Sequence, residues 1–537
     1  MSIPLTVDAR EYGLVGDGTT NDQPAFERLV DALGDACAAD GRPRTLRVPA
    51  GRYVMRDRPT VWRSGVSLVG AGRGATCFVL CNPGSPTTPV PLAWFTSQQH
   101  GASRDNHLAD ITFAHFEIDG SGVRTAGYDP LAKGLGMQYV LRGRFSDLYV
   151  HDTAATGFGC DFLQDTVVEG VLCERCGRQD SGEEMGGAGI GIGIGGWGMV
   201  ERLTVTTCTA IGNGTNGIFV ELQREYWPPP RGIRITACHA EDNRFGISDW
   251  GADGLLVTSS TMIANHDAGF DVSSQGTSGI GGRGGVVTGC VIDGNVGDGI
   301  GFGNTPGPYA LRGNRISNNG QYGYRQHNLA GGDQETATDI VLEANDIRDN
   351  ALDGVRVDAP LLDPSLVANR VRSNGRRAAP ATSGGGEGVR YDDLSMTDDH
   401  ADWPADGHRG KRLVVGRQSA VVVFNTATGL SLAPVRPGAG TAWSDGTPAP
   451  GSAYRLPGAP GPRSGLTVAA AVTGAQMHGN RIWDPMRPPT QTHAMWITAE
   501  GSWTGGRVSD NDFGGNASYA MRFDTPPSGG RWRDNDT

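Results

Sequence analysis

The sequence predicts an all-β solenoid, a fold in which short strands wind into stacked coils. Glycine makes up 83 of the 537 residues, about twice its usual share, with no collagen period. A motif of Asn, a short gap, Gly and alternating apolar residues also recurs. Its glycines lie 29, 23, 30, 24 and 31 residues apart, at Gly217, Gly246, Gly269, Gly299, Gly323 and Gly354. A repeat of this length, with turn residues and no helical periodicity, is typical of a β-solenoid.

The N-terminal segment is the one region with a helical pattern. Residues 8–22 read DAREYGLVGDGTTND, and the next residues place Ala25, Phe26, Leu29, Val30 and Leu33 on one helical face. A strand at 46–48 and the segment PAGRYV at 49–54 follow. Because a solenoid end exposes unpaired strand edges, we expect this helix to cap the first coil.

These two motifs resemble the N-terminal signature of the pectate-lyase-type right-handed parallel β-helix superfamily. That group includes alginate C5-epimerases, glycoside-hydrolase-28-related proteins and phage tail-spike depolymerases. In its signature, YGAxGDGxxDD precedes a capping helix and PxGxY opens the first coils. The resemblance covers roughly residues 6–80 by motif and the remainder by repeat pattern. It implies a right-handed parallel β-helix and an enzyme that acts on a glycan.

The repeat also suggests domain boundaries. We expect a cap and first coils over 1–80, a parallel β-helix over 81–392 and terminal coils over 466–537. The late motif Gly388–Asp392 is interpreted as one more coil. Between 393 and 465 the pattern breaks into Pro-, Gly-, Asp- and Ala-rich sequence with one clear strand, 419–424, which predicts an inserted β-rich subdomain.

Counting from each repeat glycine separates the core from the surface. Because side chains alternate along a strand, positions +1 and +3, which are almost all apolar, should face the core. Positions +2 and +4 should then face outward as an ordered stripe: Gly159/Asp161, Gly191/Gly193, Phe219/Glu221, Ser248/Trp250, Asp271/Ser273, Gly301/Gly303, Arg325/His327, Arg356/Asp358 and Arg390/Asp392. A rigid stripe of this kind is a platform for a preorganised site.

Carboxylates at one end of this stripe are the candidate catalytic groups. Asp161 and Glu221 are two coils apart, as are Glu221 and Asp271, so their backbones should be about 9–10 Å apart. Carboxyl pairs about 6.5–9.5 Å apart suit inverting glycoside hydrolysis. The glycine-containing coil between Asp161 and Glu221 should leave room for a sugar ring. Ordinary solvated surface residues remain the alternative for each of these positions.

Further positions are candidates for substrate binding. Trp250 can stack on a sugar face, and Arg356 with Asp358 follows along the stripe. Asp180 lies in a Gly-rich loop that either overhangs the stripe or is an ordinary turn. Asp249 breaks the alternation, which indicates either a bulged strand, the interpretation we favour, or a buried carboxylate with a raised pKa.

Arg325 and His327 make the far end of the stripe basic, as a uronate or sulfate group requires. The chain has two lysines, Lys133 and Lys411, so Arg325, Arg356 or His327 is the expected base for β-elimination, with calcium as a possible cofactor. No other cofactor and no metal site is expected.

Resemblance to the alginate epimerases places Asp161 at the position of their catalytic Asp. Their segment Tyr-Gly-Phe-Asp-Pro-His-Glu corresponds here to Phe158–Gln164, in which Phe158 replaces the Tyr and Leu163 the His. Three functions stay open: a polysaccharide hydrolase or lyase/epimerase, a tail-spike or glycan-binding module, and a biosynthetic enzyme that uses the stripe for a small substrate.

Composition narrows the partners. The net charge of −12 argues against a general nucleic-acid binder, and no run of eighteen apolar residues predicts a membrane span. Residues 1–7 lack the charged and apolar regions of a signal peptide, so we expect a cytoplasmic protein, with leaderless export or a phage particle as alternatives. Nine cysteines, mostly in strand-like runs, indicate reduced, buried thiols.

Overall fold

The computed structural model describes residues 3–56, 59–82, 92–95, 103–125, 127–177, 186–273, 281–328, 336–376, 381–405, 407–435, 439–443, 445–457 and 463–537. It contains two compact units, which are described in turn. Met1–Asn243 with Ser248–Leu256 form unit 1, and Arg244–Ile247 with Val257–Thr537 form unit 2. Both units are built from coils of short parallel strands, so the predicted parallel β-helix is confirmed.

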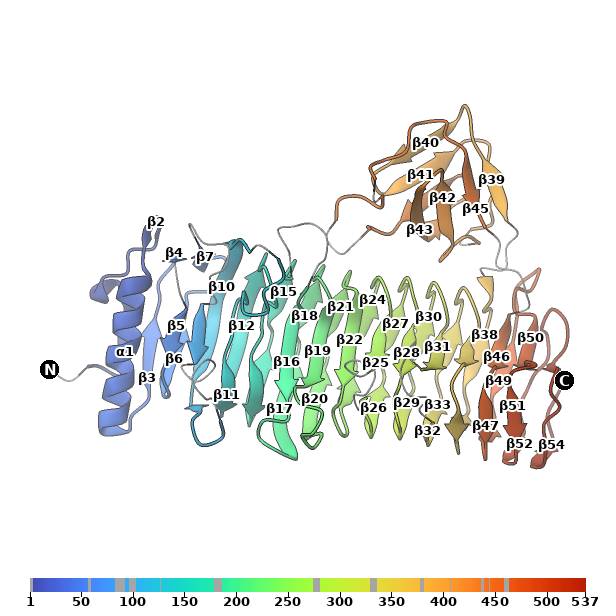
Figure 1. Ribbon diagram of the computed structural model, residues 1–537, viewed down its shortest axis with the longest axis horizontal. Helices are drawn as coiled ribbons and strands as arrows, with labels where there is room; N and C mark the ends of the chain where they lie inside the picture. Colours follow the sequence, from blue (N-terminus) through green and yellow to red (C-terminus); the bar gives the residue numbers. More distant parts are fainter. Residues whose placement is uncertain are drawn as a thin grey trace. The chain divides into compact units, whose positions relative to one another are not determined.

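The N-terminal helix α1 (Gln23–Asp40) covers the first coil of unit 1, as Figure 1 shows. Its predicted apolar face is buried, and the Phe26 ring lies 6.0 Å from Trp62 and 5.5 Å from Phe78. A short 3-10 helix (Ala9–Tyr12) precedes it. The helix therefore closes the open end of the core. In the described chain no helix is both long and apolar enough to cross a membrane.

The coils of unit 1 are made of parallel strands in adjoining columns. They are β1 (Thr6–Asp8), β2 (Asp17–Asn21), β3 (Arg44–Arg47), β4 (Gly51–Arg56), β5 (Thr60–Trp62), β6 (Val66–Val69), β7 (Thr76–Cys81), β8 (Ala93–Phe95), β9 (Leu108–Ala109), β10 (Thr112–Gly122), β11 (Gln138–Leu141), β12 (Arg144–His151), β13 (Asp161–Gln164), β14 (Thr166–Glu169), β15 (Leu172–Glu174), β16 (Ile190–Ile194), β17 (Val200–Thr206), β18 (Thr209–Ile211), β19 (Asn216–Leu222), β20 (Arg231–Thr236) and β21 (His239–Glu241). Two more strands, β22 (Phe245–Trp250) and β23 (Leu256–Thr258), contain residues of both units.

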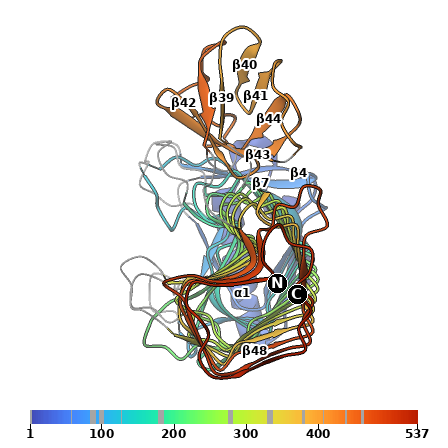
Figure 2. The ribbon, with the colours of Figure 1, turned by 90° about the vertical axis from the view of Figure 1, so that its right-hand side faces the viewer.

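Unit 2 continues with the same kind of coil, and Figure 2 looks along its stacked coils. One column consists of β25 (Phe270–Val272), β28 (Ile300–Gly303), β31 (Tyr324–His327), β35 (Val355–Val357), β46 (Ser464–Val468), β50 (His493–Ile497) and β53 (Met521–Phe523). The other columns contain β24 (Thr261–Ile263), β26 (Gly285–Thr288), β27 (Val291–Asp293), β29 (Tyr309–Arg312), β30 (Arg315–Ser317), β32 (Ala337–Thr338), β33 (Ile340–Glu343), β34 (Asp346–Arg348), β36 (Leu361–Leu362), β37 (Ser365–Val367), β38 (Arg370–Arg372), β47 (Ala471–Thr473), β48 (Gln476–His478), β49 (Arg481–Trp483), β51 (Ser502–Thr504), β52 (Arg507–Ser509) and β54 (Arg531–Arg533).

An antiparallel sheet interrupts unit 2 between β38 and β46. It contains β39 (Thr382–Gly384), β40 (Val389–Asp392), β41 (Ser395–Asp398), β42 (Arg412–Val415), β43 (Gln418–Asn425), β44 (Gly429–Leu432) and β45 (Tyr454–Leu456). It has its own core around Leu413, Val422 and Trp443. The interpretation of Gly388–Asp392 as a coil is wrong, because β40 pairs antiparallel with β41, so Arg390 and Asp392 do not belong to the stripe.

The predicted alternation within the repeat is confirmed for the core. The +1 and +3 residues Phe158, Cys160, Ile190, Ile192, Ile218, Val220, Phe270, Val272, Ile300, Phe302, Val355 and Val357 are all buried. All nine cysteines are free thiols and eight are buried, as expected. The burial of one hydrophobic column after another supplies the main stabilisation of the coils.

The repeat asparagines form hydrogen-bonded ladders inside the turns. In unit 2, the Asn319 amide Nδ2 donates to Asn350 Oδ1 at 2.9 Å, and its own Oδ1 accepts from Asn295 Nδ2 at 2.9 Å. Each Oδ1 also accepts the backbone N–H of the preceding rung, as Asn319 Oδ1 does from Asn295. A second ladder runs through Asn314, Asn345, Asn369, Asn480, Asn511 and Asn535.

The glycine of each repeat follows from this ladder. A Cβ added to Gly323 would lie 2.8 Å from Asn350 Nδ2 and 2.6 Å from the Gly354 carbonyl oxygen. The same contact recurs at Gly299 with Asn319, at 2.7 Å. Any side chain here would push neighbouring coils apart, so the Asn–Gly pattern records one packing contact repeated along the stack.

We predict that Asn319→Ala destabilises the protein by about 2–5 kcal/mol, because it leaves the buried Asn295 backbone N–H without its acceptor and removes a hydrogen bond from the side chains of both neighbouring rungs. The denaturation midpoint in urea should fall, as followed by circular dichroism. Arg315→Ala, an exposed position on β30, is the control and should change the free energy of unfolding by less than about 0.5 kcal/mol. Equal midpoints for the two variants would contradict the role of the ladder.

Candidate functional site

Asp161 begins β13 in unit 1, and its side chain is held by three partners. Its Oδ1 accepts the Gly193 backbone N–H at 2.8 Å, while Oδ2 lies 3.3 Å from Gln138 Nε2 and 3.5 Å from Lys133 Nζ. The residue is 7% exposed. These partners fix the orientation of the carboxylate and place an ammonium group beside it.

Lys133 is a site residue that the sequence analysis missed. Its side chain passes across Gly159, where an added Cβ would lie 2.4 Å from the lysine Cδ, and Nζ donates to the Gly159 carbonyl at 3.0 Å. Lys133 lies in an irregular segment before the regular repeats, so counting from repeat glycines could not place it. Two signals were available: the scarcity of lysine and the glycine two positions before Asp161.

Glu221 lies on the same face of unit 1, two strands from Asp161. It is opposite Gly193 in the pairing of β16 with β19, and Gly193 in turn contacts Asp161. Two strand spacings correspond to about 9–10 Å between the backbones. A Cβ on Gly193 would lie 2.7 Å from Gln223 Cγ and 2.9 Å from Asp161 Oδ1, so the glycine makes room for the Gln223 side chain beside the two acids.

The two carboxyl groups differ in their environment. Burial raises the pKa of Glu221 to about 7, the negative charge of Asp161 adds to the increase, and Lys133 and a hydrogen bond from Gln223 oppose it. Gln223 Nε2 donates to Glu221 Oε2 at 2.9 Å. Near neutral pH one acid is therefore paired with an ammonium group, whereas the other is poised to gain or lose a proton.

A third carboxyl group, that of Glu201, holds the backbone next to this site. Glu201 is 1% exposed, and its Oε1 accepts the backbone N–H groups of Gly195 and Trp197, both at 2.9 Å. Burial raises its pKa to about 8 against those two hydrogen bonds. Its bonds hold the turn that follows Gly193, which makes it a positioning residue. The sequence analysis missed it because it lies on β17, outside the repeat motif.

The remaining predicted residues of unit 1 have different outcomes. Trp250 is partly buried and packs edge-on against Phe219 at 4.9 Å, still on the outward face. Asp249 is fully buried within β22 and accepts the Ala252 N–H at 2.9 Å, so the favoured bulge and the proposed contact with substrate are wrong. A residue closed off in the strand cannot reach a glycan. Asp180 lies outside the described residues.

In unit 2 the predicted residues form a second group. Arg325 Nε donates to Asp358 Oδ2 at 2.9 Å, and Arg356 Nε donates to Asp358 Oδ1 at 2.6 Å. His327 is partly buried beside them, and Asp271, 7% exposed, accepts a hydrogen bond from Ser273 at 2.9 Å.

Two further residues complete the group in unit 2 and were missed. Asp298 and Tyr322 each precede a repeat glycine by one residue, in a turn that the strand alternation does not describe.

Among the described residues no group of three or more His, Cys, Asp and Glu side chains is arranged to hold a metal ion. The calcium ion considered for a lyase stays a prediction.

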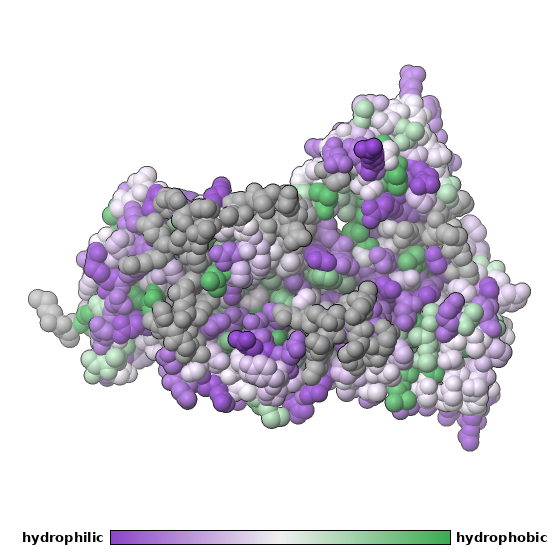
Figure 3. Space-filling view, in the orientation of Figure 1, coloured by the Kyte–Doolittle hydropathy of each residue, from purple (hydrophilic) through white to green (hydrophobic). Residues whose placement is uncertain are grey.

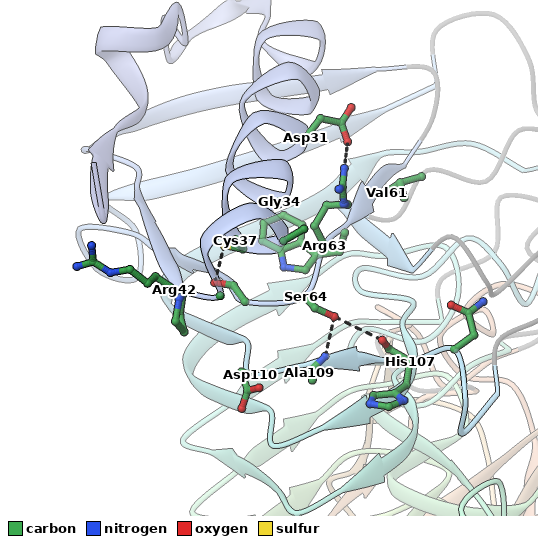
Figure 4. A pocket seen from close by; sticks show the side chains of 16 residues that line it. Asp31, Gly34, Cys37, Arg42, Val61, Arg63, Ser64, His107, Ala109 and Asp110 are labelled. Carbon is green, nitrogen blue, oxygen red and sulfur yellow. Dashed lines mark hydrogen bonds and ion pairs between the residues drawn. The ribbon is translucent and has the colours of Figure 1, made fainter. Parts of the chain in front are cut away.

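A pocket of about 570 Å³ lies elsewhere in unit 1, between α1 and the segment around Trp62 (Figure 4). Arg63 on its wall is bound by Asp31 and Asp35 of the helix, and Ser64 Oγ bridges the chain at His107 and Ala109. None of the predicted site residues lines it.

On the face in Figure 3, the coloured residues are mostly hydrophilic or neutral, with hydrophobic ones in small patches.

Comparison with known proteins agrees with the fold. Residues 229–334 match the family model described as a right handed beta helix region. The capsule KN3-specific depolymerase 1 of Klebsiella phage KN3-1 is 27% identical over 172 residues, which cover 31% of this chain and 20% of that protein. Mannuronan C5-epimerase AlgE3 of Azotobacter vinelandii is 28% identical over 204 residues, 30% of this chain and 10% of the epimerase. The chain thus matches a fifth or less of these two relatives.

One solved structure has a fold similar to that of this chain over about two thirds of its length. The catalytic unit of an α-1,3-glucanase from Streptomyces thermodiastaticus superposes with a TM-score of 0.52 at 12% identity, over 68% of this chain and 63% of that one. Together with the family model, this likeness shows the right-handed parallel β-helix that the N-terminal motifs imply.

We predict that substitutions of two neighbours move the pKa of Glu221 in opposite directions. Asp161→Asn removes a negative charge and should lower the pKa from about 7, whereas Lys133→Gln removes a positive charge and should raise it. Titration of the side-chain carboxyl carbon by NMR measures both shifts. Glu169→Gln, on β14 and bound to Arg144, is the control. Shifts of the same sign would contradict the described geometry.

Proposed function

We propose that this right-handed parallel β-helix protein is a glycan-modifying enzyme that cleaves glycosidic bonds with Glu221 and Asp161. The observation that carries the proposal is the unequal pair of acids around Gly193. Glu221 has a pKa near neutrality, while Asp161 is fixed by Lys133, Gln138 and a backbone N–H. Glycoside hydrolysis requires a general acid and a general base on the same face of the enzyme.

The geometry supports an inverting hydrolysis. Protonated Glu221 gives its proton to the leaving glycosidic oxygen as the bond to the anomeric carbon breaks. The Asp161 carboxylate takes a proton from the water that attacks this carbon from the opposite face. Glu221 ends deprotonated and Asp161 protonated, and exchange with solvent restores both. Lys133 places a positive charge beside Asp161, and its hydrogen bond to the Gly159 carbonyl holds it there.

The substrate class we propose is an acidic polysaccharide. The relatives support it by their names, a capsule-specific depolymerase and two further mannuronan C5-epimerases besides AlgE3. Lys133 adds a cation at the site. This cation also favours a second candidate, β-elimination or epimerisation at a uronate, in which a positive group beside the substrate carboxylate stabilises the charge that develops on loss of the C5 proton.

We predict that Glu221→Gln and Asp161→Asn each lower kcat by at least about 100-fold on the polysaccharide that the wild-type protein cleaves. Glu169→Gln is the matched control and should keep full activity. The screen covers alginate, polygalacturonate and bacterial capsular polysaccharides. Reducing ends without absorbance at 235 nm indicate hydrolysis, while absorbance at 235 nm indicates elimination. Full activity of both site variants would refute the assignment of the site.

In the wild-type protein, kcat/KM should decrease as the pH rises through about 7, because the acid form of Glu221 is lost. In Lys133→Gln this decrease should move to higher pH, because the pKa of Glu221 rises when the positive charge is removed. A pH profile of initial rates measures the shift, with Glu169→Gln again as the control. A profile that does not change around pH 7 would exclude Glu221 as the proton donor.

A further inference from the structure

A notch in unit 2 brings an acid and an imidazole to one point. Gly301 of β28 pairs with Arg325 of β31, and Gly303 pairs with His327. A Cβ added to Gly301 would lie 3.9 Å from Asp298 Oδ2 and 3.9 Å from His327 Nε2, with the Ala268 Cβ at 3.8 Å. These are ordinary contact distances, so the glycine leaves a space the size of a small group between the two side chains.

Polar atoms that face this notch have no protein partner. Asp298 is 8% exposed, and its Oδ1 accepts the Tyr322 backbone N–H at 3.1 Å. Within the described part of the chain, no hydrogen bond is found for its Oδ2 or for His327 Nε2. These two atoms flank the space beside Gly301 and can bind a polar ligand group that enters it.

Arginine side chains flank the notch in a fixed arrangement. Arg325 and Arg356 both donate through Nε to Asp358, and their guanidinium carbons lie 5.4 and 5.9 Å from the centre of the Tyr322 ring. The terminal nitrogens of Arg325 have no hydrogen-bond partner among the described residues. A rigid guanidinium group with free N–H groups is the side chain that binds a carboxylate in a bidentate manner.

The charges around the notch favour an anion. Burial raises the pKa of Asp298 to about 7, Arg325 opposes this increase, and Asp267 and Asp358 add to it. Burial and the charge of Arg325 lower the pKa of His327. Burial raises the pKa of Asp267 against Arg244 and Arg325, and that of Asp353 against Arg356 and Arg463. Two guanidinium groups, Arg325 and Arg356, therefore share the single carboxyl group of Asp358 beside the notch.

We propose that unit 2 carries a binding site for the carboxylate of an acidic sugar, formed by Arg325, Asp298 and His327 around Gly301. Arg325 donates to the carboxylate through its terminal nitrogens. The protonated Asp298 side chain donates a further hydrogen bond to it, and His327 bonds a sugar hydroxyl. The proposal does not rest on the catalytic assignment in unit 1, because it requires binding alone.

The test uses the catalytically impaired variant Glu221→Gln, so that binding is measured without turnover. Isothermal titration calorimetry at pH 6 with oligogalacturonate, oligomannuronate and oligoglucuronate should show binding of at least one of them. The carboxyl-reduced, neutral form of that oligosaccharide should bind at least 10-fold more weakly. The carboxyl-reduced oligosaccharide carrying sulfate groups tests the other anion. If it bound as tightly as the oligouronide, the assignment to a carboxylate would be overturned.

Variants in unit 2 assign the binding to the notch. Arg325→Gln and His327→Gln should each weaken binding at least 10-fold, while Arg312→Gln, whose ion pair with Glu343 is on the surface, should not. Circular dichroism spectra establish that each variant is folded. If none of the three oligouronides binds, or if both notch variants keep the affinity of the parent, the proposal is wrong.

The pH dependence provides a second measurement. Binding should weaken at least 10-fold between pH 6 and pH 8.5, because Asp298 loses its proton and repels the ligand. Asp298→Asn keeps a donor without the titration, so its affinity should vary less than about 3-fold over the same range. Equal pH dependence in the two proteins would overturn the role of Asp298. Inactivity of the wild-type enzyme on every polysaccharide would refute the proposed function alone.

Discussion

The contact between each ladder asparagine and the repeat glycine beside it is the constraint on which the coils depend. The asparagine amide uses both its donor and its acceptor groups inside the turn, where water cannot replace them. A Cβ on the glycine would lie within about 3 Å of that amide, so the absence of a side chain lets the neighbouring coil pack against it. Because the two residues recur together, the spacing of coils is set by hydrogen-bond geometry at the turns and by apolar packing within the strands.

This fixed spacing explains how the outward residues acquire different chemistry from one coil to the next. A coil contributes one or two side chains to each face, and the pairing register of adjacent strands determines which side chains lie next to them. In unit 1 the glycine at 193 makes room for the Gln223 side chain beside two acids. In unit 2 the glycine at 301 leaves space beside an acid and an imidazole. Residues without side chains thus define where a ligand can enter.

The sequence predicted the coils, the capping helix and the core columns, because each depends on a local periodicity of the residues along the chain. It also placed Asp161, Glu221, Arg325 and His327 on the outward face. It could not place Lys133, Asp298 or Tyr322, because these residues lie in turns or irregular segments, where side chains do not alternate between faces. It missed Glu201 because this residue lies on β17, outside the repeat motif. Asp249 is a different case. The sequence pattern marked it as an exception to the alternation, but only the three-dimensional structure shows that its carboxyl group is buried.

The antiparallel sheet between β38 and β46 illustrates what such a stack tolerates. Asn369 and Asn480 are adjacent rungs although 111 residues separate them, and a Cβ on Gly375 would lie 2.6 Å from Arg463 Cβ. The chain therefore departs and returns at almost the same point, so no coil has to stretch to accommodate the extra sequence. Segments of different length can therefore be inserted, deleted or exchanged at this turn during evolution, while the stack of coils keeps its dimensions.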